Sequence, residues 1–292
     1  MPNLKDLKTR INSVTSTQKI TSAMKMVAAA KLRRAQEAAE SGRPYTTRMQ
    51  AVIASLAAKA DKSSASELLI GRATVKTHLL VIISADKGLC GGFNGSIARL
   101  AKQEITRLEA EGKAAQVYIV GRKAADALGS VITDRTFARI EGVQGTNLGF
   151  ESAGKIASNI ITGFEEGQFD AVSVIFNRFV NAITQEVTHT SLIPVNVDAP
   201  EDGANDVEKF YDYEPEEAEI LSALLPRNMS TQIFSALLES SAAELAARMT
   251  AMDNATRNAG DMIDRLTLVY NRTRQANITS ELIEIISGAE AL

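Results

Sequence analysis

The stretch LAARMTAMDNATRNAGDMIDRLTLVYNRTRQAN, from Leu245 to Asn277, decides the architecture of this chain. Steps of four and three residues alternate without a fault along Leu245, Met249, Met252, Thr256, Ala259, Ile263, Leu266, Tyr270, Thr273 and Asn277. This spacing puts all these side chains on one face of a helix and is typical of coiled-coil packing. Several of them are small or polar, so we expect a long helix with a modest pairing seam. A long core helix of a bundle is the alternative interpretation.

The N-terminal segment predicts a second long helix, because neither glycine nor proline occurs from Asn3 to Ser41. Its apolar residues first follow the same spacing, at Leu4, Leu7, Ile11 and Val14. The pattern slips past Gln18 and resumes at Ile20, Met24, Val27 and Lys31. A slip of this size predicts a stutter, which locally unwinds a coiled coil without ending it. The helix is longer still if it continues through Gly42–Pro44 to Ala60.

The segment between these helices has a different composition, with 14 of the 18 glycines between Gly71 and Gly167. Apolar runs such as THLLVIISAD and AQVYIVG alternate with amphipathic runs such as IARLAKQEITRLEAEG. Strands that alternate with helices predict an α/β domain with a mainly parallel sheet, here with a hairpin turning about Asn181-Ala182 at its edge. The expected organisation is 1–60 as an N-terminal coiled-coil helix, 70–198 as a Rossmann-like α/β domain, 199–226 as an acidic linker and 227–292 as a C-terminal coiled-coil helix.

A glycine-rich turn, SADKGLCGGFNG from Ser84 to Gly95, lies between a predicted strand and a predicted helix. A phosphate-binding P-loop needs a lysine after its last glycine, and this turn has none. A dinucleotide fingerprint would need glycine at Cys90, and Arg122 follows the second strand where an acidic residue is required soon after. We therefore interpret the turn as structural, with Asn94 or Ser96 capping the helix. The alternative, an α/β nucleotide-binding enzyme with helical arms, rests on this turn and the alternating middle segment.

Composition excludes several other classes of function. Cys90 is the single cysteine, and the two histidines, His78 and His189, are far apart in the sequence. An intramolecular disulfide framework and a Cys/His zinc cluster are therefore excluded, and no motif links Cys90 to either histidine as a nucleophile. No apolar run is long enough to span a bilayer, and the N-terminus does not read as a secretory signal. We expect no cofactor and no metal site.

Charge is distributed unevenly although the net charge is only −3. The segment Met1–Arg48 is strongly basic, whereas Glu201–Glu219 is strongly acidic. The basic residues either form a solvated face or follow an anionic partner. Nucleic acid is the weaker choice because no aromatic residue occurs before Pro44, so an acidic protein surface is the better candidate. From charge alone we expect Lys31, Arg33 and Arg34 to belong to this basic flank.

Three motifs closely resemble one family in the same order along the chain. They are TSTQKITSAMKMVAAAKLRRAQ (15–36), GLCGGFN (88–94) and NRTRQANITSELIEIISGA (271–289). Together they resemble the gamma subunit of F-type ATP synthases, of the bacterial type. The resemblance implies that the terminal helices form an antiparallel coiled coil, the central stalk, inside a ring of alpha and beta subunits. It also implies a middle domain that rests, with the epsilon subunit, on the ring of c subunits.

The resemblance implies a rotor that couples proton-driven rotation to ATP synthesis or hydrolysis at beta and regulates ATPase activity and proton flow, without catalysis of its own. It places the protein peripherally on the cytoplasmic face of the bacterial inner membrane. By motif position, Met24 and Lys25 pass the acidic lever loop of beta, although some relatives have an acid at the position of Lys25. The residues that match those engaging beta's catch loops are Arg274, Gln275, Thr279 and Glu281. An apolar shaft tip is expected at Leu282, Ile283, Ile285 and Ile286.

A coiled-coil scaffold unrelated to energy transduction is the third hypothesis. The heptads alone support it, and it predicts self-association through the long helices. A gamma-type shaft instead pairs its two helices within one chain.

Overall fold

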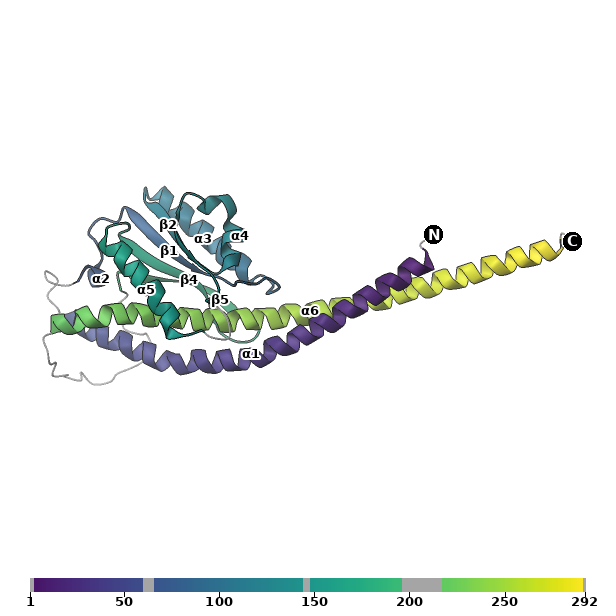
Figure 1. Ribbon diagram of the computed structural model, residues 1–292, viewed down its shortest axis with the longest axis horizontal. Coiled ribbons are helices and arrows are strands. Elements are labelled where there is room, and N and C mark those ends of the chain that lie inside the picture. The colour runs from purple at the N-terminus through teal and green to yellow at the C-terminus, as the bar shows by residue number, and fades with distance from the viewer. Residues whose placement is uncertain (1–2, 60–65, 144–147, 196–216, 291–292) are drawn as a thin grey trace. The chain divides into compact units, whose positions relative to one another are not determined.

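The computed structural model describes residues 3–59, 66–143, 148–195 and 217–290. The chain divides into two compact units. One consists of Met1–Ala29 with Arg248–Leu292, and the other of Ala30–Ala247. Two long terminal helices, α1 (Leu4–Lys59) and α6 (Glu217–Glu290), each contribute to both units (Figure 1).

Both long helices contain a proline, and neither ends there. The helix α1 is continuous through Gly42 and Pro44, as the longer of the two predicted versions requires. The predicted start of the C-terminal helix at residue 227 is wrong, because α6 begins at Glu217 and has Pro226 inside it. Leu221 and Leu225, which lie inside α6 just before Pro226, are buried in an apolar cluster. This packing stabilises the helix on the N-terminal side of the proline, where propensity alone predicts an end. The remainder of the predicted acidic linker, 199–216, lies outside the described residues.

The middle of the chain forms a five-stranded sheet in the order β3-β2-β1-β4-β5. All neighbouring pairs are parallel except β4 and β5, which form an antiparallel hairpin. The strands are β1 (Thr77–Ile83), β2 (Ala114–Val120), β3 (Thr136–Ile140), β4 (Ala171–Phe179) and β5 (Gln185–Ile193). The helices are α2 (Glu67–Ile70), α3 (Phe93–Ala110), α4 (Arg122–Leu128), a 3-10 turn (Gly129–Ile132) and α5 (Phe150–Glu165). The predicted α/β class is confirmed, and the sheet includes β3, whose sequence TFARI contains no continuous apolar run.

A large apolar core lies between the sheet, α5 and α6 in the second unit (Figure 1). Buried residues from α5, such as Ile156 and Ile160, meet Val81 and Val174 of the central strands. One stripe of α6, Met229, Ile233, Ala236 and Leu237, is buried in the same core. The α/β domain therefore shares its core with α6 along this stripe.

Candidate functional site

In the first unit, α1 and α6 lie side by side and run in opposite directions (Figure 1). The Lys25 ammonium is 2.6 Å from Asp253 Oδ1, and the Thr21 and Thr256 hydroxyls are 2.8 Å apart. One turn further on, a β-carbon added at Gly260 would lie 3.1 Å from Gln18 Nε2. The residue numbers rise along one helix as they fall along the other, so the pairing is antiparallel and lies within one chain.

The seam predicted on α6 is the face that α6 buries. Over residues 261–280, the partly buried side chains are Ile263, Leu266, Tyr270, Thr273 and Asn277, and the others are exposed. Each of these is a position of the predicted heptad, and Met252 and Ala259 before them are buried. The heptad interpretation of this half of the coil is confirmed.

The predicted stutter in α1 is wrong. The inward-facing positions continue in unbroken steps of three and four through Val14, Gln18, Thr21, Lys25 and Ala28. Two of the apolar residues on which the stutter was based, Ile20 and Val27, are 60% and 56% exposed. The helix keeps its register because small and polar side chains, such as Thr21 opposite Thr256, fit the seam. Apolar residues of α1 and α6 are therefore left on the outside of the pair, among them Met26, Leu268 and Val269.

Lys25 lies at the edge of the seam and is bonded within the chain. Its Nζ donates to Asp253 Oδ1, and Arg257 donates to Asp253 Oδ2 at 2.5 Å. The hydrogen bond from Lys25, and to a lesser extent that from Arg257, lowers the pKa of the Asp253 carboxyl from its ordinary value. The neighbouring side chain of Met24 is partly buried. A partner that engages Lys25 must therefore compete with Asp253 or bind the pair.

The basic residues Lys31, Arg33 and Arg34 lie on the part of α1 that belongs to the second unit, and all three are exposed. Arg33 donates to Glu37 one turn later, with both side chains mostly in solvent. Exposed pairs of this kind contribute little to stability. The positive charge of this segment is thus available to an external partner.

The predicted contact residues near the end of α6 are exposed, and the pairing seam does not include them. Arg274, Gln275, Thr279 and Glu281 all face solvent, and Thr279 Oγ1 donates back to the Gln275 carbonyl oxygen at 3.0 Å. Beyond Asn277, every side chain described as far as Ser287 is exposed. The four predicted tip residues, Leu282, Ile283, Ile285 and Ile286, are 53–68% exposed.

The glycine-rich turn after β1 is closed by bonds within the protein. Asn94 Oδ1 accepts from the backbone N–H of Ala85 at 3.0 Å, and buried Asn177 donates to the Phe93 carbonyl oxygen at 3.3 Å. The strand order reverses between β1 and β4, and this is the place where open α/β sheets ordinarily bind ligands. Because the polar groups of the turn and of β4 bond one another there, the structural interpretation of the turn is supported.

The predicted helix cap in this turn is wrong. Gly92 is the N-cap residue of α3 and makes no side-chain hydrogen bond, while Ser96 donates to the carbonyl oxygen of Phe93 inside the first turn. The glycine with the strictest requirement is Gly121, after β2, where the sequence pattern showed nothing special. Its φ is +91°, and an added β-carbon would lie 2.0 Å from the Ser84 carbonyl oxygen.

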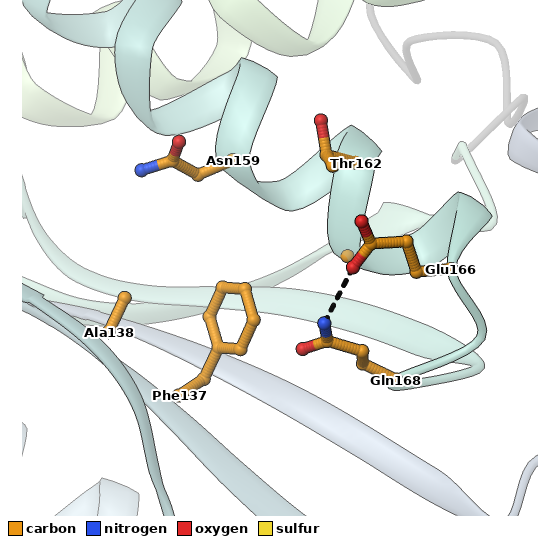
Figure 2. A pocket seen from close by; sticks show the side chains of 7 residues that line it. Phe137, Ala138, Asn159, Thr162, Glu166 and Gln168 are labelled. Atoms are coloured by element: carbon orange, nitrogen blue, oxygen red, sulfur yellow. Dashed lines mark hydrogen bonds between the residues drawn. The ribbon is translucent and has the colours of Figure 1, made fainter.

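A cavity of about 230 Å³ lies elsewhere, between β3 and α5 (Figure 2). Phe137 and Ala138 line it from β3, and Asn159 and Thr162 line it from α5. Gln168 donates to Glu166 at 2.7 Å at one end. No lysine or arginine lines this cavity, so it offers no charge that would neutralise a phosphate. The cavity does not support the nucleotide-binding alternative.

Comparisons with known proteins identify the family. A family model described as ATP synthase matches residues 3–292. The chain is 52% identical over 293 residues to the ATP synthase gamma chain of Dinoroseobacter shibae, and 53% identical over 293 residues to that of Paracoccus denitrificans. Each alignment covers 100% of both chains. The chain belongs to the ATP synthase gamma-chain family.

Solved structures agree with this family membership. The central stalk and c-ring of Tetrahymena thermophila mitochondrial ATP synthase contains a chain with 32% identity and a TM-score of 0.60, covering 81% of this chain and 99% of that one. A chain in Euglena gracilis mitochondrial ATP synthase has 20% identity and a TM-score of 0.68, covering 99% of this chain and 94% of that one. Because its identity is only 20%, the likeness to the Euglena gracilis chain shows the fold alone.

The two histidines of this gamma-family chain meet inside its α/β domain. His78 Nε2 on β1 and His189 Nε2 on β5 each lie 2.8 Å from the hydroxyl of buried Ser173 on β4. Burial, and then the nearby His189, lowers the pKa of His78 to about 4. A neutral imidazole bonded inside a sheet is a structural group, and both histidines bond to Ser173 rather than to Cys90.

Within the described ranges, no helix has the length and hydrophobicity needed to cross a bilayer. The same residues contain no group of three or more His, Cys, Asp or Glu positioned to hold a metal ion.

Proposed function

We propose that this chain is the central-stalk rotor of a proton-translocating F-type ATP synthase. Its paired terminal helices form the shaft, and its α/β domain connects the shaft to the ring of c subunits. Rotation driven by proton flow is passed through the shaft to the beta subunits, where ATP is made or hydrolysed. The chain itself is a non-catalytic subunit, and through its position it regulates ATPase activity and proton flow.

One observation supports this proposal more than any other. The helix α6 extends beyond its paired segment as a single helix whose described side chains are exposed, with Ile278, Leu282 and Ile285 among them. An apolar helix end of this kind is unfavourable in water and indicates a surface that another protein covers. A shaft whose tip turns inside a ring of alpha and beta subunits accounts for such a surface.

The individual contacts with beta belong to the proposal. Arg274, Gln275, Thr279 and Glu281 would engage the catch loops, and Met24 with Lys25 would pass the acidic lever loop. Lys31, Arg33 and Arg34 would extend the basic flank along α1. All except Met24 and Lys25 are well exposed, which supports a role in binding rather than in folding.

The finer assignment of place is also proposed. Membership of the gamma-chain family assigns the chain to an ATP synthase complex, and we propose that it is a peripheral subunit there. The bacterial relatives favour the cytoplasmic face of the inner membrane, with the epsilon subunit beside the α/β domain.

The test is a double variant, Arg274→Ala with Gln275→Ala, in the complex assembled with alpha and beta subunits. Because both side chains are exposed, the variant chain should fold as the wild type does, while ATP hydrolysis by the complex falls. The matched control is Lys102→Ala with Gln103→Ala, an adjacent cation and amide exposed on α3. Equal turnover for the two variants would remove Arg274 and Gln275 from the mechanism.

A further inference from the structure

One buried carboxylate joins three elements of the second unit. Among the described residues, Glu239 on α6 is the only charged residue that is buried, at 6% exposure. A buried carboxylate is costly unless its oxygens are paired and hydrogen-bonded. Its position in the structure therefore calls for an explanation beyond ordinary packing.

Both carboxylate oxygens of Glu239 have donors. Arg43 Nε on α1 donates to Oε1 at 2.7 Å, and the backbone N–H of Phe179 donates to Oε2 at 3.0 Å. Arg43 Nη2 also donates to the Phe179 carbonyl oxygen at 3.1 Å. Three hydrogen bonds thus form a closed triangle between α1, α6 and Phe179, the last residue of β4. We call Arg43, Glu239 and Phe179 the joint.

The joint lies far from the two covalent connections between the α/β domain and the long helices. The chain enters the domain before β1 and leaves it after β5, and both connections lie at the same end of the strands, beside the start of β4. An apolar cluster including Ile53, Val195 and Leu225 packs the helices near that end. The joint lies at the opposite end of β4, at its last residue.

The distance between the two attachments can be worked out along α6. From Leu225 to Glu239 the helix rises by about 21 Å, at about 1.5 Å per residue. Between them the domain contacts α6 mainly through apolar side chains such as Met229 and Ile233. Apolar packing is non-directional, whereas the bonds of the joint are directional and fix Phe179 relative to both helices.

We propose that Arg43 and Glu239 are positioning residues that fix the far end of β4 to both long helices, so that torque passes between the α/β domain and the helices without the domain turning about its covalent connections. This inference rests on the proposed rotor function. With the joint removed, the domain stays attached at the other end of the strands and along its apolar face, but it shifts relative to the helices when the rotor turns against a load.

The experiment compares variants in the whole ATP synthase, reconstituted in membrane vesicles. Glu239→Gln retains the shape of the side chain but removes its charge and cannot accept from both donors. Arg43→Lys keeps a positive charge but loses the fork of donors that reaches Phe179. The matched control is Arg178→Ala, which removes the exposed pair with Glu186 on the strand residue before Phe179.

Two quantities are measured for each variant: ATP hydrolysis, and proton pumping driven by that hydrolysis. For Glu239→Gln and Arg43→Lys, the ratio of pumping to hydrolysis should fall by about twofold or more, and the fall should grow as the opposing proton gradient is raised. Hydrolysis by the detached alpha–beta–gamma complex, which carries no load, should remain at the wild-type rate. If the two residues had only a structural role, the variants would contain less folded chain, and hydrolysis and pumping would fall together. Circular dichroism of the variant chains measures the folded content.

An unchanged ratio in both joint variants at every gradient, with Arg178→Ala also unchanged, overturns the inference. So does a loss of both activities in proportion to unfolded chain. Failure of the rotor proposal itself is distinguishable, because the wild-type chain would then not support coupled pumping in the same vesicles.

Discussion

Replacing Gly121 by alanine should destabilise the α/β domain far more than replacing Gly95, in the glycine-rich turn, by alanine. Gly121 has φ +91° and ψ 150°, a region that is essentially restricted to glycine. Holding alanine there costs about 1–3 kcal/mol. The added β-carbon would also lie 2.0 Å from the Ser84 carbonyl oxygen, so the ends of β1 and β2 must move apart.

That movement strains two hydrogen bonds of Ser84. Its N–H donates to the Val120 carbonyl oxygen at 2.8 Å, and its hydroxyl accepts from the Ala124 N–H at 2.9 Å. Each such bond contributes about 1 kcal/mol. The total loss of unfolding free energy is therefore about 3–5 kcal/mol, a large part of the stability of an ordinary domain.

The assay is thermal and urea unfolding followed by circular dichroism, with Gly95→Ala as the control. Gly95 lies inside α3, and no atom is within 4 Å of its added β-carbon. Alanine is favoured over glycine in a helix by about 1 kcal/mol, so this variant should melt slightly higher than the wild type. A Gly121→Ala variant that melts at the wild-type temperature, or a Gly95→Ala variant that is the less stable of the two, would contradict this prediction.

Two further predictions concern the coiled coil and the histidines. Replacing Thr21 and Thr256, whose hydroxyls are 2.8 Å apart, by cysteines should give a disulfide within one chain on oxidation, seen on a non-reducing gel. Crosslinked dimers as the main product would instead favour the self-associating scaffold. The neutral His78, with its pKa of about 4 in the fold, should make the domain lose stability as pH falls from about 6.5 towards 4, because the unfolded state takes up the proton first. The loss of unfolding free energy is at most about 3 kcal/mol. The variant His78→Asn should therefore show a flatter dependence of urea unfolding on pH. An equally steep dependence in that variant would show that His78 is not the group responsible.

The C-terminal seam could be predicted because its positions repeat without interruption from Leu245 to Asn277. The same method failed on α1, where it followed hydrophobicity to Ile20 and Val27. Those side chains are exposed, whereas Gln18 and Thr21 face the partner helix. Hydrophobicity indicates that a side chain will be covered, but it does not distinguish a partner within the chain from one outside it.

Other features depend on tertiary context that no local pattern contains. The burial of Glu239 follows from Arg43 and Phe179, which are far from it in sequence. The strict requirement at Gly121 follows from the approach of Ser84 across the ends of two strands. The expected contacts with beta came from the family resemblance, and their exposure is compatible with that role. They remain predictions until the assembled complex is measured.

The most direct test of the central claim is to observe rotation of this chain in a complex with alpha and beta subunits fixed to a surface. A probe can be attached through Lys102→Cys, because Lys102 is exposed on α3 and the native Cys90 is buried. We expect sustained rotation in one direction that requires ATP and stops when ATP is withdrawn. A complex that hydrolyses ATP while the probe on this chain stays still would contradict it.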